Sequence, residues 1–347
     1  MNRESGIELL RGILMFMVVL VHLTGNGVLN KDNPIPWTEP NWVMGNVIDA
    51  ICYPAVNCFV LISGYFGMRP TLKKFLKLDI PIILYGLMAL VLLNEFSLGA
   101  AARTLVPVIH CNYWFLTGYV ILMLVAPFIN KAVDAMDSFD LKVLVFFILF
   151  VFVIIPSVSE LRYAEPRGMD FVNFSVIYLI GRYIKKLNLN IKRRKSIMLY
   201  MISSFFCFGL TLLFAHKYDI NQGWQSRFYA YNNILIYVQA LSLFFIFKSI
   251  RIQSKFINWI APSFFYIYIL HEMPTIHDKL YKWIHLSDYY YSNYFLAHII
   301  ICGLLIFCIS LCVDIVIRRL MLGIVIEKAS SYIESVLNAL CKRLHFY

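Results

Sequence analysis

Ten apolar stretches of membrane-spanning length are the feature of this 347-residue sequence that most restricts its fold. A helix needs about 20 apolar residues to cross a hydrocarbon core of roughly 30 Å. Backbone polar groups must be paired inside lipid, which favours helices over irregular segments. The sequence therefore predicts an all-α fold, a polytopic membrane bundle of about ten transmembrane helices. The stretches cover residues 7–29, 47–68, 78–96, 113–130, 143–158, 171–184, 197–215, 231–247, 259–276 and 295–317.

The composition and the distribution of charge fit the same class of protein. Hydrophobic residues make up 60% of the chain and charged residues 15%, against roughly 25% charged residues in a soluble domain. The net charge of +11 would suit a nucleic-acid-binding protein, but most of the 31 lysine and arginine residues fall in alternate connections between the spans. Basic residues mark the cytoplasmic loops of membrane proteins. The pattern predicts cytoplasmic N- and C-termini and no nucleic-acid partner.

The apolar pattern changes near the C-terminus. Ile333, Val336 and Leu340 repeat at helical spacing, which is typical of an amphipathic helix on a membrane surface. We expect residues 1–318 to form one ten-helix transmembrane domain and residues 319–347 to form a cytoplasmic amphipathic tail in contact with membrane lipid. The first span is longer than a signal-peptide core and carries charge, so we expect it to be retained.

The eight cysteines do not indicate a metal centre. Most lie within apolar spans, where thiols pack as small hydrophobic groups, and no Cys-x-x-Cys pair occurs. Cys308 and Cys312 share a helix face, but the one carboxylate near them is that of Asp314. The sequence therefore predicts no metal site.

Three ionisable residues, Glu8, Arg11 and His22, lie in the first predicted span. Eleven residues of helix, about three turns, place Arg11 and His22 on the same face roughly 16 Å apart along the axis. One interpretation is structural: Arg11 reaches the inner headgroups and pairs with Glu8, while His22 is a hydrogen-bonded interior histidine. The other is a polar cavity in which a neutral His22 imidazole is available as a base, because burial disfavours the charged ring.

Four segments together resemble the membrane acyltransferase 3 family, the transmembrane acyltransferases that modify bacterial polysaccharides. The first is the pair Arg11 and His22 in the first span. The others are VNCFVLISGYF in the second span, YWFLTGYVILMLVAPFIN in the fourth, and FYIYILH, which ends at His271. The resemblance covers the chain from about Glu8 to Arg318. Many family members carry an Arg-x-x-Arg pair before the third span, where this chain has lysines, which keep the charge but not the bidentate fork.

The resemblance implies a transmembrane O-acyltransferase in the bacterial cytoplasmic membrane. The donor would be cytoplasmic acetyl-CoA or another acyl-CoA. The acceptor would be a hydroxyl of a cell-surface polysaccharide or of a lipid-linked glycan such as an undecaprenyl-linked one. His22 would take the proton from the attacking hydroxyl or become transiently acylated itself, and the sequence leaves both routes open.

Donor-binding residues are expected near the cytoplasmic ends of the first three spans. A CoA diphosphate needs charge-assisted contacts, although inner-loop lysines also fit a role in binding anionic lipid. The small residues of the second span would approach the acyl chain, or else pack helices. The predicted set is Arg11, Lys73, Lys74, Lys77, Ser63, Gly64 and Tyr65.

Acceptor-binding residues are expected at the outer ends of two spans. Tyr113 and Trp114 would stack on a sugar ring, or else belong to an aromatic belt at the membrane surface. His271 and Glu272 would bind the acceptor or relay a proton, or else form a satisfied buried pair.

Two other function classes fit parts of the sequence. A transporter or flippase for a lipid-linked glycan would also need buried charges and a central cavity, but no pair of broken helices occurs at matching positions of two halves. A glycan polymerase would be expected to have larger outer loops. Consumption of acetyl-CoA would separate an acyltransferase from a transporter.

Overall fold

The computed structural model describes residues 4–30, 35–159, 167–218 and 225–343, and within these ranges every regular element is a helix. Seven segments are long and apolar enough to cross a membrane. They confirm a helical, multi-pass membrane protein, and the number ten and the placement of both termini in the cytoplasm stay predictions. The seven are α1 (Ser5–Gly25), α2 with α3 (Pro40–Cys52 and Ala55–Phe66), α4 (Leu72–Leu92), α6 (Trp114–Ala135), α7 with α8 (Ser138–Leu149 and Ile155–Val158), α10 (Arg193–Tyr218) and α16 (Phe295–Asp314) with the π-helical turn Ile315–Met321.

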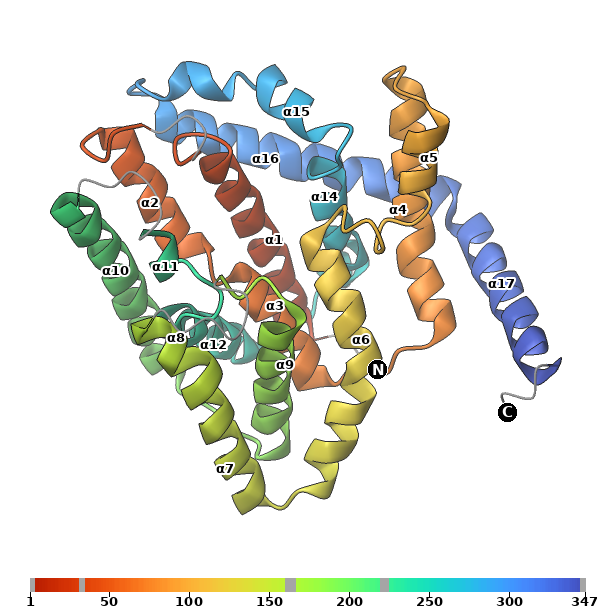
Figure 1. Ribbon diagram of the computed structural model, residues 1–347, viewed down its shortest axis with the longest axis horizontal. Helices are drawn as coiled ribbons and strands as arrows, with labels where there is room; N and C mark the ends of the chain where they lie inside the picture. Colours follow the sequence, from red (N-terminus) through yellow and green to blue (C-terminus); the bar gives the residue numbers. More distant parts are fainter. Residues whose placement is uncertain (1–3, 31–34, 160–166, 219–224, 344–347) are drawn as a thin grey trace.

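The other three predicted spans coincide with shorter helices. These are α9 (Phe171–Lys186), α12 (Ile234–Lys248), and α13 (Lys255–Ile260) followed by a 3-10 turn at Ala261–Ser263 and α14 (Phe264–His271). They pack with α1 and α3 in the middle of the bundle, where Tyr178, Phe244 and Ile267 are fully buried. Figure 1 shows α9, α12 and α14 among the longer helices.

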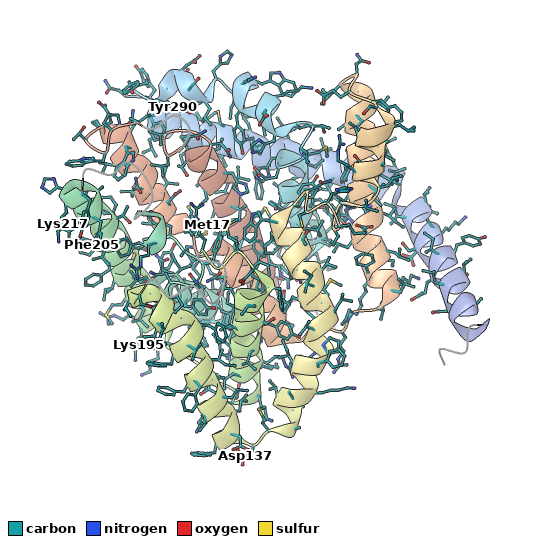
Figure 2. All side chains as sticks on the ribbon, viewed as in Figure 1. Met17, Asp137, Lys195, Phe205, Lys217 and Tyr290 are labelled. Carbon is teal, nitrogen blue, oxygen red and sulfur yellow. The ribbon has the colours of Figure 1, made fainter. Side chains whose placement is uncertain are left out.

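The helices at the edge of the bundle expose apolar side chains. Phe205 of α10 is 70% exposed and Phe146 of α7 is 62% exposed. Figure 2 shows Phe205 at the outer edge of the molecule, on the helix that carries Lys195 at one end and Lys217 at the other. Large apolar side chains on an outer surface, with charges at the helix ends, are what a lipid-facing helix requires.

Glycines allow α3 and α9 to approach closely. A side chain added at Gly64 would lie 2.2 Å from the backbone oxygen of Tyr178, and one added at Gly181 would lie 2.5 Å from that of Leu61. Small residues at such crossings let helix backbones come together in membrane proteins. The two glycines thus allow the backbones of α3 and α9 to lie in direct contact.

The remaining described elements are short helices and turns around the bundle and the C-terminal helix. At the end where α1 finishes lie α15 (His277–Trp283) and a 3-10 turn at Leu286–Tyr289, and α5 (Leu98–Thr104) lies beside the end of α4. The short helix α11 (Gln225–Phe228) packs against α10 within the bundle. The predicted amphipathic tail is helical as α17 (Gly323–Arg343), which packs on α4, and residues 344–347 lie outside the described part. Buried Asp314 binds Arg318 at 2.7 Å and accepts a hydrogen bond from Tyr85 at 2.8 Å, tying α16 to α4.

Candidate active site

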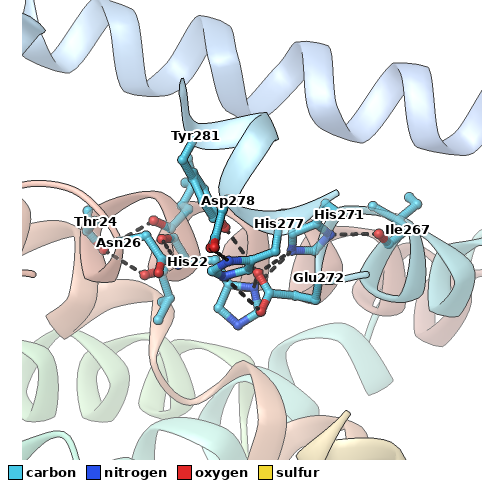
Figure 3. A network of polar contacts seen from close by, with 11 residues as sticks. His22, Thr24, Asn26, Ile267, His271, Glu272, His277, Asp278 and Tyr281 are labelled. Atoms are coloured by element: carbon cyan, nitrogen blue, oxygen red, sulfur yellow. Dashed lines mark hydrogen bonds and ion pairs between the residues drawn. The ribbon is translucent and has the colours of Figure 1, made fainter. Parts of the chain in front are cut away.

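His22, on the last turn of α1, faces the end of α14. Its Nδ1 lies 2.9 Å from Nε2 of His271 and 3.1 Å from Oε1 of Glu272 (Figure 3). His271 is the last residue of α14 and Glu272 follows it directly, so the end of one helix carries both side chains to the ring. The structure thus brings together His22 and two of the four predicted acceptor-binding residues.

The hydrogen bonds fix the proton positions on the two rings. Nδ1 of His271 lies 2.6 Å from the carbonyl oxygen of Ile267, which can only accept, so this nitrogen carries the hydrogen. A neutral imidazole has one N–H, which leaves Nε2 of His271 as an acceptor. His22 therefore donates from Nδ1 toward His271 and Glu272. The lone pair of His22 is on Nε2, the nitrogen that points away from both partners.

Glu272 joins three elements through its carboxylate. Oε1 accepts a hydrogen bond from the Tyr281 hydroxyl at 3.0 Å, and Oε2 lies 3.8 Å from Nε2 of His277. Tyr281 and His277 both belong to α15. The Asn26 side chain donates to the backbone oxygen of His22 at 2.9 Å, which fixes the end of α1. The carboxylate that orients His22 is therefore itself held in place.

Within the described ranges, the side chains of His22, His271 and Glu272 are also the group that could hold a metal ion. One possible ligand atom from each of His22, His271 and Glu272 lies within 4.8 Å of the others. The hydrogen bond of His271 to Ile267 would also suit a metal-binding histidine. The 2.9 Å separation of the two ring nitrogens is a normal hydrogen-bond length, and a shared proton accounts for it.

A small apolar pocket lies beside His22. Its volume is about 30 Å³, and helices α1, α3, α6 and α14 form its wall. Met15 and Val18 precede His22 by about two turns and one turn on the same face of α1, and Arg11 lies one turn before Met15. The residues that line the pocket are Met15, Val18, His22, Val56, Phe59, Trp114, Phe115, Phe265 and Tyr268.

Ser63 and Tyr119 lie on the Arg11 side of this pocket. Ser63 is one turn beyond Phe59 on α3 and Tyr119 one turn beyond Phe115 on α6. Their hydroxyl oxygens are 3.0 Å apart, within hydrogen-bonding distance. A polar contact between α3 and α6 thus lies beside the face of α1 that runs from Arg11 to His22. Tyr119 lies within the fourth-span motif, but its pairing with Ser63 needs the packing of α3 on α6.

The remaining predicted donor-binding residues have other partners. Arg11 pairs with Glu8 at 3.5 Å, and 35% of its side chain is exposed. Gly64 faces the backbone of α9 at Tyr178. Tyr65 lies near the C-terminal end of α3. Two ammonium groups lie over its ring, that of Lys185 at 4.8 Å and that of Lys248 at 5.1 Å from the ring centre. The loop-lysine pattern alone did not single out these two cations.

The lysines at the start of α4 contact the tail. Lys73 lies 2.7 Å from Glu327 of α17, Lys77 binds the other oxygen of the same carboxylate, and the Lys73 backbone N–H donates to Glu334 at 3.3 Å. Lys74 donates to the backbone oxygen of Arg69 at 2.7 Å. The described side-chain contacts of Lys73 and Lys77 are therefore with the tail.

Tyr113 and Trp114 face two different spaces. Trp114 lines the apolar pocket and stacks on Tyr231, with ring centres 5.5 Å apart. The Tyr113 hydroxyl donates to the backbone oxygen of Ile269 at 3.2 Å, and its ring lines a second cavity. The boundary between the two cavities passes through neighbouring residues at the start of α6.

The second cavity is larger and is lined by both polar and apolar residues. Its volume is about 350 Å³, and its wall includes Glu95, Arg103, Asn112 and Thr275. Met273, Pro274 and Thr275 follow Glu272 directly in the chain and line the cavity, so it begins beside the carboxylate that orients His22. Sequence reasoning missed Arg103 and Asn112 because the connection between α4 and α6 carries no motif. A lone arginine in a connection that the sequence places outside the membrane is the one signal that marks it.

Comparison with protein families gives one match. The family model described as an acyltransferase domain, that of the acyltransferase 3 family, matches residues 4–317. These residues include α1, which carries Arg11 and His22, and the end of α14 with His271 and Glu272. No curated protein and no solved structure gave a match.

Proposed function

The chain belongs to the acyltransferase 3 family, and we propose that it is a transmembrane O-acyltransferase of the bacterial cytoplasmic membrane. It transfers an acetyl group from cytoplasmic acetyl-CoA to a hydroxyl of a cell-surface polysaccharide or a lipid-linked glycan. The single observation that carries this proposal is the position of His22. Its ring is held by Glu272 at 3.1 Å and forms part of the wall of an apolar pocket.

His22 acts as the general base. Nε2 takes the proton from the acceptor hydroxyl as its oxygen attacks the thioester carbonyl carbon, and the new C–O ester bond forms. The C–S bond then breaks, and the imidazolium returns its proton to the departing CoA sulfur. Positioned acid–base catalysis of this kind contributes roughly 10²- to 10⁴-fold in rate.

Glu272 supports this step without touching the reacting atoms. Its carboxylate accepts the hydrogen bond from Nδ1 of His22, which keeps the lone pair on Nε2. When the ring takes up a proton, the nearby negative charge stabilises the imidazolium. His271 limits how the ring can turn, because its Nε2 offers a second acceptor at 2.9 Å. Both are positioning residues.

The donor reaches His22 along the face of α1 that carries Arg11, Met15 and Val18. The extended arm of CoA is narrow enough to lie between helices, while its phosphates stay at the cytoplasmic end. Arg11 is partly exposed there and can present two donors to a phosphate. Lys185 and Lys248 lie over the ring of Tyr65 at the ends of neighbouring helices α9 and α12. These cations replace Lys73 and Lys77 as the main phosphate contacts.

The acceptor occupies the larger cavity of about 350 Å³. Arg103, Asn112 and Thr275 offer hydrogen-bond donors for sugar oxygens, and the Tyr113 ring offers an apolar face. A sugar hydroxyl that passes Thr275 comes toward the Glu272 carboxylate and the ring of His22. Nothing in the family match favours the alternative of a transporter.

Membrane vesicles of defined orientation test the proposed function. Inverted vesicles, which present the cytoplasmic face, should consume radiolabelled acetyl-CoA and carry labelled glycan in their lumen. Right-side-out vesicles, whose cytoplasmic face is sealed inside, should do neither. A transporter would leave acetyl-CoA intact in both preparations, and equal labelling in both would contradict transfer across the membrane.

A further inference from the structure

We propose that the apolar pocket beside His22 is the site of the acyl group and that it restricts the donor to acetyl-CoA. This inference rests on the proposed function, since it assigns the acyl-binding part of the same site. The pocket and the ring of His22 share a wall. An acyl group held there has its carbonyl carbon next to the base, as the transfer requires.

The lining of the pocket favours a neutral acyl group. The wall contains one histidine, His22, and no lysine, arginine or carboxylate, and the other eight lining residues are valines, a methionine and aromatic residues. An acyl group that ends in a carboxylate, such as succinyl, would lose its hydration there without gaining a cationic partner from the wall. Burial of an unpaired charge costs several kcal/mol at least.

The volume of the pocket favours a short acyl group. About 30 Å³ is available, which is close to the roughly 30 Å³ that one water molecule takes up in the liquid. The pocket therefore has room for a methyl group and little more. Each further methylene of a propionyl or butyryl chain has to displace the wall.

The wall is held by side chains that cannot move far. Val18 and Val56 are β-branched, each is 7% exposed, and each comes from a packed central helix. The Phe115 ring stacks on Tyr119 at 5.6 Å and meets the edge of Tyr268 at 6.0 Å between centres. Trp114 is stacked on Tyr231. Packing of this density makes widening of the pocket costly.

Val18 and Val56 determine the length limit most directly, because shortening either removes two methyl groups from the wall near His22. The chain offers matched controls. Val19 is the next residue on α1 and Val60 lies one turn along α3; both are fully buried and neither lines the pocket. The controls lose the same atoms and leave the pocket unchanged.

The experiment measures kcat/KM of the wild-type protein for acetyl-, propionyl-, butyryl- and succinyl-CoA, and repeats the series for Val18→Ala, Val56→Ala, Val19→Ala and Val60→Ala. We expect the wild type to prefer acetyl-CoA over propionyl-CoA by about 10-fold or more, because one methylene in a fitted pocket is worth roughly 10- to 200-fold. Val18→Ala and Val56→Ala should shift the ratio toward the longer chains by a similar factor. The controls should keep the wild-type ratio.

Two results would overturn the inference while leaving acyl transfer in place. One is equal use of butyryl-CoA or succinyl-CoA and acetyl-CoA by the wild-type protein. This result does not depend on the folding of any variant. The other is a pocket variant whose chain-length profile equals that of its control. Failure to use any acyl-CoA would instead overturn the proposed function itself.

Discussion

Nδ1 of His22 lies 3.1 Å from a carboxylate oxygen of Glu272, although about 250 residues of chain separate the two side chains. The contact sets which ring nitrogen carries the hydrogen and leaves Nε2 free to accept one. It also links α1 to α15, because Glu272 accepts a hydrogen bond from Tyr281 at 3.0 Å. One side-chain contact thereby positions the base and connects it to the elements at the end of the bundle.

Replacement of Glu272 by glutamine should lower kcat for acetyl transfer by roughly 10²-fold. The amide can still accept a hydrogen bond, but it lacks the charge that stabilises the protonated His22 ring. KM for acetyl-CoA should change little, because Glu272 does not contact the donor. Steady-state kinetics of the purified protein measure both quantities.

Asp278→Asn is the matched control for this variant. Asp278 is 87% exposed, lies next to His277 and makes no described contact with His22. Loss of its charge should leave kcat near the wild-type value. An unchanged kcat in Glu272→Gln, or an equal loss in Asp278→Asn, would show that the carboxylate does not support the base.

Arg11→Lys should raise KM for acetyl-CoA by roughly 10- to 100-fold, since a hydrogen bond to a charged group is worth about 1.5–3 kcal/mol. Lysine keeps the charge but cannot present two parallel donors to a phosphate. Arg251→Lys makes the same chemical change at an exposed position and should have no effect. If KM for acetyl-CoA is unchanged in Arg11→Lys, Arg11 is a structural partner of Glu8.

The contact between the tail and α4 should depend on pH. Hydrogen bonds from Lys73 and Lys77 hold the pKa of Glu327 below its usual value of 4.5. A lowered carboxyl pKa means that the contact contributes at neutral pH and is lost as the pH falls through the pKa of the folded state. The groups are exposed, so the effect is small and sensitive to salt.

Spin labels at exposed Val91 of α4 and Tyr332 of α17 report this contact. The distance distribution should be narrow at neutral pH and broaden in acid or at high salt. Glu327→Gln should show the broad distribution already at neutral pH. A distribution that stays the same in all these conditions would mean that apolar packing alone holds α17.

The close approach of α3 and α9 predicts a stability difference between two glycine variants. Gly64→Ala places a methyl group 2.2 Å from a backbone oxygen of α9, so a helix has to shift. We expect a loss of roughly 1–3 kcal/mol, seen as a lower Tm in detergent. Gly209→Ala is the control, because a side chain there meets nothing within 4 Å. Equal Tm values for the two variants would contradict the packing role of Gly64.

Sequence periodicity predicted the helices better than it predicted their lengths in the bundle. All ten apolar stretches coincide with helical segments, because the need to pair backbone groups in lipid acts locally. The stretches at 171–184, 231–247 and 259–276 become shorter helices than the other seven. Their burial among other helices depends on tertiary packing, which hydropathy along the chain does not report.

Some features of the candidate site could likewise be predicted from the sequence, and others could not. The shared face of Arg11 and His22 follows from helical geometry alone. The contact of His22 with Glu272 does not, because it depends on where α14 ends relative to α1. The pairing of Lys73 with Glu327 could not be predicted from the sequence either. The amphipathic pattern of the tail predicts that one face is buried, but it does not show which helix covers that face.

The most direct test of the account is acetyl transfer by His22→Ala. The variant should insert normally, keep KM for acetyl-CoA within a few-fold of wild type, and lose roughly 10²- to 10⁴-fold in kcat. Added imidazole should restore part of that loss, since it can occupy the space of the missing ring. His216→Ala, at the end of α10 beside Trp37, should transfer acetyl groups at the wild-type rate. A well-expressed His22→Ala protein that transfers acetyl groups at a near-normal rate would contradict the assignment of His22 as the base.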